Sequence, residues 1–238
     1  MDYLQDSYDK FVKTQSYFKI LYEPNNEILG IPFKEIDIPS IDLIPNYDTK
    51  QKLSTEELFE ILGKYATVDI LNHSYISFSF REQIFVHVFG WSVPSIESLN
   101  EAVNFIDSDT VLEIAAGVGF WSRLLRSKNV NVHTTSIVDG HYYKEMEMEQ
   151  NIWTPIELLS GVDAVQKYTD ANCLFLSWGN GVLYEALPFF KGNKVIIIGE
   201  DSGGCTDYLE SDDFELVKCI DIPKWYCLHD EMRFYVRK

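Results

Sequence analysis

Apolar residues change their spacing about halfway along the chain. After residue 110, runs of consecutive apolar residues alternate with segments whose apolar residues recur every three or four positions. Consecutive apolar residues predict strands buried on both faces, and the wider spacing predicts amphipathic helices between them. Strands are predicted at 111–115, 130–135, 174–177 and 195–199, and helices at 120–127 and 181–190.

This alternation predicts an α/β fold. Buried strands separated by helices form a mostly parallel, Rossmann-like sheet with helices on both faces. Two further strands, at 214–222 and 231–238, follow each other with no helical pattern between them. They predict a C-terminal antiparallel β-hairpin, because two strands joined without a crossover helix pair antiparallel.

The N-terminal part of the chain lacks this alternation. Four prolines within residues 24–45 predict an extended chain there, since proline is excluded from helix interiors and central strands. Ser54, followed three residues later by Glu57, predicts a capped helix over 54–65. Residues 74–91 are rich in aromatic and β-branched side chains and fit either a strand or a helix.

These differences predict two parts. We expect a mostly helical and irregular N-terminal extension or cap over residues 1–92, and a Rossmann-like domain over residues 93–238. The domain is expected to begin with a helix at 94–106, after Pro94 and Ser95. One face of that helix carries the apolar residues Ile96, Leu99, Val103 and Ile106.

The amino-acid composition limits the kinds of partner that the protein is expected to bind. The 238 residues include 37 Asp and Glu against 20 Lys and Arg, a formal net charge of −17. Nucleic acid and anionic membranes are bound through clustered basic side chains, so this charge argues against both as partners. We expect a small-molecule or protein acceptor, and the sequence pattern leaves the oligomeric state open.

Other classes of site and location are also disfavoured. The four cysteines form no C-x-x-C pair and the histidines show no metal-ligand spacing, so no metal site is expected. No apolar run is long enough to span a bilayer, and the first residues do not have the pattern of a secretory signal. These features predict an intracellular, cytoplasmic protein.

The stretch from Glu113 to Gly119 combines a strand end, a small-residue turn and a helix start. Ala115, Gly117 and Gly119 let the backbone approach a ligand, and the helix N-terminus faces the same place. A dinucleotide fingerprint needs a third glycine where this chain has Ser122. Glu113 would repel a pyrophosphate but suits the cationic cofactor S-adenosylmethionine. We expect a β-branched residue at Gly119 to block the cofactor and leave the fold in place.

This stretch resembles motif I of class I S-adenosylmethionine-dependent methyltransferases, usually D/E-x-G-x-G-x-G, with Ala115 at the first glycine. The predicted C-terminal hairpin also resembles that family, whose sheet closes in this way. A narrower resemblance, from residue 89 to the C-terminus, is to an uncharacterised subgroup in which a Y/F-x-W-x-I/V-P segment precedes motif I. Here that segment reads FGWSVP. The resemblance implies methyl transfer from S-adenosylmethionine to an unknown acceptor.

The resemblance also implies roles for single residues at the cofactor. Family members hold both ribose hydroxyls with an acid at the end of the second strand, where this chain has Ser136, with Asp139 three residues further on. Asp163 matches a family aspartate that meets the adenine amino group, although it also fits a plain helix-terminus acid. Trp91 would cap the pocket. The cofactor-binding set is therefore Glu113, Ala115, Gly117, Gly119, Ser136, Asp139, Asp163 and Trp91.

The residues next to the transferred methyl come from the later strand ends. The resemblance places Ser177 and Trp178, at the end of the fourth strand, beside the sulfonium and the acceptor. Glu200, after the fifth strand, is the candidate general base. Amine-directed members often carry an N/D-P-P-Y/F turn after the fourth strand, whereas this chain reads SWGN.

Three classes of function follow from these features. The first is a methyltransferase. The second is a catalytically inactive, methyltransferase-like binding protein, which the missing ribose acid and the altered turn favour. The third is an NAD-type oxidoreductase, which Glu113 and the missing third glycine disfavour.

Overall fold

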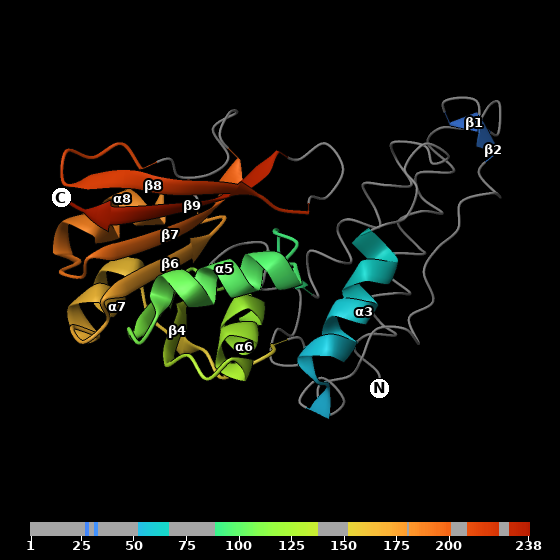
Figure 1. The fold of residues 1–238 in the computed structure, drawn as a ribbon, viewed down its shortest axis with the longest axis horizontal. Helices are drawn as coiled ribbons and strands as arrows, with labels where there is room; N and C mark the ends of the chain where they lie inside the picture. The colour runs from blue at the N-terminus through green and yellow to red at the C-terminus, as the bar shows by residue number, and fades with distance from the viewer. Residues whose placement is uncertain are drawn as a thin grey trace.

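A seven-stranded sheet runs through residues 111–237 of the protein in the computed structural model (Figure 1). The structure describes residues 52–66, 89–137, 152–179, 181–200, 209–223 and 229–238, together with the paired dipeptide strands β1 (Glu27–Ile28) and β2 (Ile31–Pro32). The sheet order is β5-β4-β3-β6-β7-β9-β8. Its strands are β3 (Val111–Ile114), β4 (Val132–Ser136), β5 (Glu157–Leu158), β6 (Cys173–Ser177), β7 (Lys194–Glu200), β8 (Phe214–Asp221) and β9 (Asp230–Arg237).

Strand directions confirm the predicted fold class. The strands β5, β4, β3, β6 and β7 pair in parallel. β9 is antiparallel to both β7 and β8, so β8 runs in the same direction as the parallel strands. The protein therefore has a mostly parallel, Rossmann-like α/β sheet that ends in an antiparallel strand pair.

Helices cover both faces of the sheet. The first face carries α5 (Ile96–Ile106) and α6 (Phe120–Ser127), and Figure 1 shows α5 crossing in front of the strands. The second face carries α7 (Gly161–Lys167), α8 (Val182–Ala186) and the short 3-10 helix η5 (Leu187–Phe189). Alternate residues of each strand point to opposite faces, which produces two separate cores.

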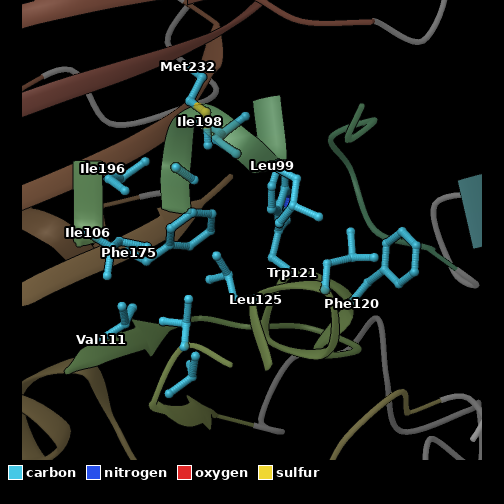
Figure 2. Packing of buried hydrophobic residues seen from close by; sticks show 14 of the residues in the cluster. Leu99, Ile106, Val111, Phe120, Trp121, Leu125, Phe175, Ile196, Ile198 and Met232 are labelled. Atoms are coloured by element: carbon cyan, nitrogen blue, oxygen red, sulfur yellow. The ribbon is translucent and has the colours of Figure 1, made fainter. Parts of the chain in front are cut away.

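The core beneath α5 and α6 is the larger of the two. Figure 2 shows Leu99 and Trp121 from the helices meeting Phe175, Ile196 and Met232 from the strands. Except for Trp121, which is 4% exposed, these side chains are at most 2% exposed. Buried Phe, Trp and aliphatic side chains of this kind supply most of the stability of such a domain.

The helix starts follow the predicted caps. Ser54 and Glu57 form the reciprocal capping pair at the start of α3 (Thr55–Ala66), with N–O distances of 2.7 and 3.2 Å. Ser95 caps α5, and its partner is Ser98. The predicted apolar face of α5 is wrong at one position. Ile96 is 55% exposed, because the buried face of α5 consists of Ser98, Leu99, Ala102 and Ile106 and Ile96 lies to one side of it.

Three local differences from the predicted elements have structural causes. The second strand begins at Val132 rather than at residue 130, because the Val130 N–H still bonds to the Leu125 carbonyl in the turn that ends α6. The dipeptide strand β5 is too short to show an apolar alternation. The helix α7, which starts at the N-cap Ser160, falls in a segment with few apolar residues.

The predicted division at residue 92 stays a prediction, because most of residues 1–88 lie outside the described part, including nearly all of 24–45 and all of 74–88. On the described N-terminal side, Leu58 of α3 is fully buried in the same cluster as Phe89 and Phe120. None of the helices that the structure describes has the length and apolar character needed to span a bilayer.

Candidate functional site

The chain reverses its direction of travel across the sheet between β3 and β6. From β3 it moves to β4 and β5 on one side, and then returns to β6 on the other side of β3. Open α/β sheets bind ligands beyond the carboxyl ends of the strands at such a switch point. The residues that directly follow β3 and β6 here are Ala115 and Trp178.

Both of these residues have backbone conformations that side chains disfavour. Ala115 has φ +53° and Trp178 has φ +57°, in the left-handed region. That conformation costs a non-glycine residue roughly 1–2 kcal/mol. Ala115 occupies the first glycine position of the methyltransferase motif, so the structure keeps the glycine-like backbone there without a glycine. Strain of this kind concentrates at functional sites.

The two glycines of the turn differ in what surrounds them. At Gly117 (φ +55°), a side-chain Cβ would have no described atom within 4 Å. At Gly119 (φ +72°), it would lie 2.9 Å from Thr154 Cγ2 and 3.3 Å from Ile156 Cδ1. The expectation that a larger residue at Gly119 would only block the ligand is therefore wrong. Gly119 packs against the segment that leads to β5, and the space that the described residues leave open lies beside Gly117.

This contrast predicts different effects for two matched substitutions. Gly119→Ala should lower the free energy of unfolding by about 2–3 kcal/mol, because both the backbone strain and the close contact act against it. Gly117→Ala should lower it by about 1 kcal/mol from backbone strain alone. Urea denaturation of the two variants checks the order, and equal losses would show that Thr154 and Ile156 do not restrict Gly119.

Glu113 is buried beneath the turn. It is 1% exposed and accepts a hydrogen bond from the Ser122 hydroxyl, which in turn accepts one from Thr134 Oγ1 at 2.6 Å. Burial raises the pKa of Glu113 to about 7, although the Ser122 hydrogen bond and the positive charge of Arg126 favour the ionised form. The carboxyl group thus lies between β3 and α6, behind the turn.

Ser122, the residue at the third glycine position of a dinucleotide fingerprint, is fully buried. Its hydroxyl donates a hydrogen bond to Glu113 and accepts one from Thr134. A glycine at that position serves close packing of the helix on the strand. In this protein the residue at that position is Ser122, which instead donates a hydrogen bond to the buried carboxyl group of Glu113.

The structure brings Trp91, Ser177 and Trp178 together. The Trp91 and Trp178 rings stack with centroids 5.3 Å apart and planes inclined by 25°. Trp178 Nε1 donates to Asp230 Oδ1 at 3.0 Å, and Ser177 Oγ lies 2.8 Å from Ser92 Oγ. Three segments that are distant in sequence therefore meet at the carboxyl end of β6.

The other predicted residues are spread along the same edge of the sheet. Ser136 ends β4, is 8% exposed and pairs with Leu158. Glu200 ends β7, where its Oε1 accepts from the His229 N–H at 3.0 Å. Asp163 is exposed and bonded to the N-cap Ser160, with Ser160 Oγ 2.6 Å from Asp163 Oδ2. The predicted residue Asp139 lies outside the described residues.

Sequence reasoning missed several neighbours of these residues. Ile137, after β4, and Leu158, in β5, are 51% and 66% exposed although both are large and apolar. The sequence could have indicated Ile137 as a residue of the candidate site, because it directly follows the predicted site residue Ser136. Ser92 and Asp230 could not, since only long-range contacts bring them to Ser177 and Trp178.

Comparison with known proteins finds distant fold similarity. No family model and no curated protein matches the sequence. TrmN from Thermus thermophilus aligns with a TM-score of 0.45 and 9% identity over 66% of this chain and 53% of that one. Precorrin-6y C5,15-methyltransferase from Geobacter metallireducens aligns with a TM-score of 0.38 and 11% identity, over 60% and 88% of the two chains.

A third solved structure is the Pyrococcus abyssi tRNA (uracil-54, C5)-methyltransferase in complex with S-adenosyl-L-homocysteine. It aligns with a TM-score of 0.41 and 12% identity, over 59% of this chain and 38% of that one. The neighbours from Geobacter metallireducens and Pyrococcus abyssi are methyltransferases by name, but similarity at this level is too distant to assign a function to this chain.

Proposed function

We propose that this protein binds S-adenosylmethionine at the carboxyl ends of β3 and β6 and transfers its methyl group to an acceptor. The observation that carries this proposal is the turn at Gly117, which combines open space on one side with the buried carboxyl of Glu113 behind it. A bound cation would favour the ionised form of this carboxyl and the pyrophosphate of NAD would disfavour it, so the site suits a cofactor with a sulfonium and an ammonium group.

Each part of the cofactor has a proposed place along this edge. The methionine end lies over Ala115 and Gly117, and the adenine lies against the exposed apolar side chains of Ile137 and Leu158. The ribose lies near Ser136, which offers one neutral hydrogen bond where a carboxylate would offer two stronger ones. The remaining proposed contacts are Asp139, Asp163 and Trp91, while Glu113 and Gly119 support the turn from behind.

S-adenosylmethionine supplies an electrophilic methyl group when it is bound. The work left to the chain is to hold the acceptor in line with that methyl group at about 3 Å. Ser177 and Trp178 lie at the correct end of β6 to do so. Glu200 is the proposed proton acceptor for a hydroxyl acceptor, although its Oε1 already accepts the His229 N–H.

Thermal stabilisation tests the cofactor. S-adenosylhomocysteine at a hundred times its dissociation constant should add about 2.7 kcal/mol of stability. For a chain of this size, that corresponds to a rise in Tm of roughly 5–10 °C. NAD at the same concentration should leave Tm unchanged. Stabilisation by NAD and not by S-adenosylhomocysteine would overturn the proposal.

A second candidate function is a binding protein without turnover. It is favoured by the fixed side chain of Trp178, which Trp91 stacks upon and Asp230 holds at the end of β6. Both candidates bind the cofactor, so turnover separates them. Mass spectrometry of small molecules that co-purify with the protein would identify the bound cofactor and any methylated product.

A further inference from the structure

A chain of three hydrogen-bonding side chains ends at Ser177. Trp121 Nε1 donates to Ser92 Oγ at 2.8 Å, and Ser92 Oγ lies 2.8 Å from Ser177 Oγ. Trp121 is 4% and Ser92 2% exposed, so both polar groups depend on these contacts. Ser177 is half-buried at the carboxyl end of β6.

The indole ring of Trp121 donates but does not accept, which favours one direction for the hydrogen bonds that run from Trp121 through Ser92 to Ser177. Indole is a donor only, so Ser92 must receive the Trp121 hydrogen and cannot return its own. Within the described residues, the partner left for the Ser92 hydrogen is Ser177 Oγ. Either hydroxyl of the pair could donate to the other, but only donation from Ser92 to Ser177 gives the buried Ser92 hydrogen a partner among the described residues. In that arrangement the Ser177 hydrogen points elsewhere. Ser177 then presents a hydrogen-bond donor at the switch point of the sheet.

The other polar groups around Ser177 are already engaged. Asp230, fully buried, takes the Trp178 indole hydrogen on Oδ1, and Glu200 takes the His229 N–H on Oε1. The stacked rings of Trp91 and Trp178 lie beside Ser177, and both residues are half-buried. A flat aromatic surface with a hydroxyl donor next to it favours a planar ligand that carries lone pairs.

We propose that the methyl acceptor is a planar conjugated molecule that packs against Trp91 and Trp178 and accepts a hydrogen bond from Ser177 through a carbonyl oxygen or ring nitrogen. An alkylammonium group has only donors, so it could use the remaining lone pair of Ser177 but would leave the Ser177 hydrogen without an acceptor. Ser92 and Trp121 are positioning residues, because they set which way the Ser177 hydrogen points. This inference rests on the proposed function only in identifying the ligand as the acceptor.

Two bicyclic probes of similar size test the polarity of the site. Quinoline carries a ring nitrogen that only accepts, and indole carries an N–H that only donates. Their dissociation constants can be measured by ligand-observed saturation-transfer NMR, with and without saturating S-adenosylhomocysteine. The wild-type protein should bind quinoline more tightly than indole by about 2- to 12-fold, the range of one net hydrogen bond.

Three protein variants test the direction of the hydrogen bonds from Trp121 through Ser92 to Ser177. Ser177→Ala should weaken the binding of quinoline to the affinity of indole and leave the affinity for indole unchanged. Trp121→Phe keeps a buried ring but removes the donor, so Ser177 can reverse and the quinoline-to-indole ratio should fall toward one. Phe175→Leu is the matched control. It removes a ring whose centroid lies 5.4 Å from that of Trp121 without touching the donor, so the ratio should persist.

The outcomes separate this inference from the proposed function. Equal or tighter binding of indole, a ratio that Ser177→Ala leaves unchanged, or absence of binding by both probes would overturn the inference. Tighter binding of protonated 1,2,3,4-tetrahydroisoquinoline than of quinoline would also overturn it, in favour of an ammonium acceptor. If the ratio holds but S-adenosylhomocysteine does not bind, the proposed function fails and the polarity of the site stands.

Discussion

Replacement of Trp153 by alanine is expected to lower the free energy of unfolding by about 3–5 kcal/mol, because the side chain is fully buried. Its ring stacks on Phe89 with centroids 5.6 Å apart and lies 4.8 Å from Phe120. The backbone N–H of Trp153, which alanine keeps, donates to the Val118 carbonyl of the turn at 2.9 Å. Loss of the ring removes the packing on Phe120, which directly follows Gly119, so it should loosen the turn as well as the core and weaken the binding of S-adenosylhomocysteine. Urea denaturation and calorimetry measure the two effects.

Phe234→Ala is the matched control for this variant. Phe234 is also fully buried, and its ring packs 5.1 Å from that of Phe105, on β9 and α5 rather than at the turn. Its loss should destabilise the protein to a similar extent and leave the cofactor affinity of the folded molecules unchanged. If both variants lose affinity equally, Trp153 has no special relation to the turn.

Glu113→Gln is expected to change how stability depends on pH. The pKa of Glu113 is raised from 4.5 to about 7, so its neutral form favours the folded state. That contribution is fully present below pH 4.5 and is lost as the pH rises through about 7. Above pH 8 the loss reaches about 3 kcal/mol. Glutamine stays neutral, so the stability of the variant relative to wild type should rise by about 2–3 kcal/mol between pH 5 and pH 8.

Urea denaturation at several pH values measures this difference. Glu57→Gln serves as a control, because Glu57 is exposed and its hydrogen bonds to Ser54 lower its pKa. Any contribution of Glu57 is present above its usual pKa and is lost only as the pH falls below it. Its substitution should therefore give an offset that does not vary between pH 5 and pH 8. A similarly flat difference for Glu113→Gln would mean that Glu113 is already ionised, or is solvated, in the folded protein.

Local patterns were enough to predict most of the fold. Consecutive apolar residues identified β3, β6 and β7, since strands buried on both faces need no polar positions. The Ser54–Glu57 pair located the start of α3, because a capping interaction spans only three residues. The sequence did not predict β5, because a strand of two residues is too short to show a hydrophobic pattern.

The candidate site was predicted only in outline. The small-residue turn was visible, but which glycine faces open space depends on Thr154 and Ile156, which are distant in sequence. Asp163 matched a family position, and the structure shows it bonded to its own helix cap. Trp91 and Trp178 were both singled out, and the structure adds that they stack on each other.

The sequence by itself determined the α/β architecture, the antiparallel end of the sheet and the position of the small-residue turn after β3, because each depends on residues close together in the chain. The tertiary structure decided which side chains meet at the carboxyl end of β6. The Ser92–Ser177 and Trp121–Ser92 hydrogen bonds join residues 85 and 29 positions apart. Contacts over such separations form only when the whole core packs, and they leave no periodic signal in the sequence.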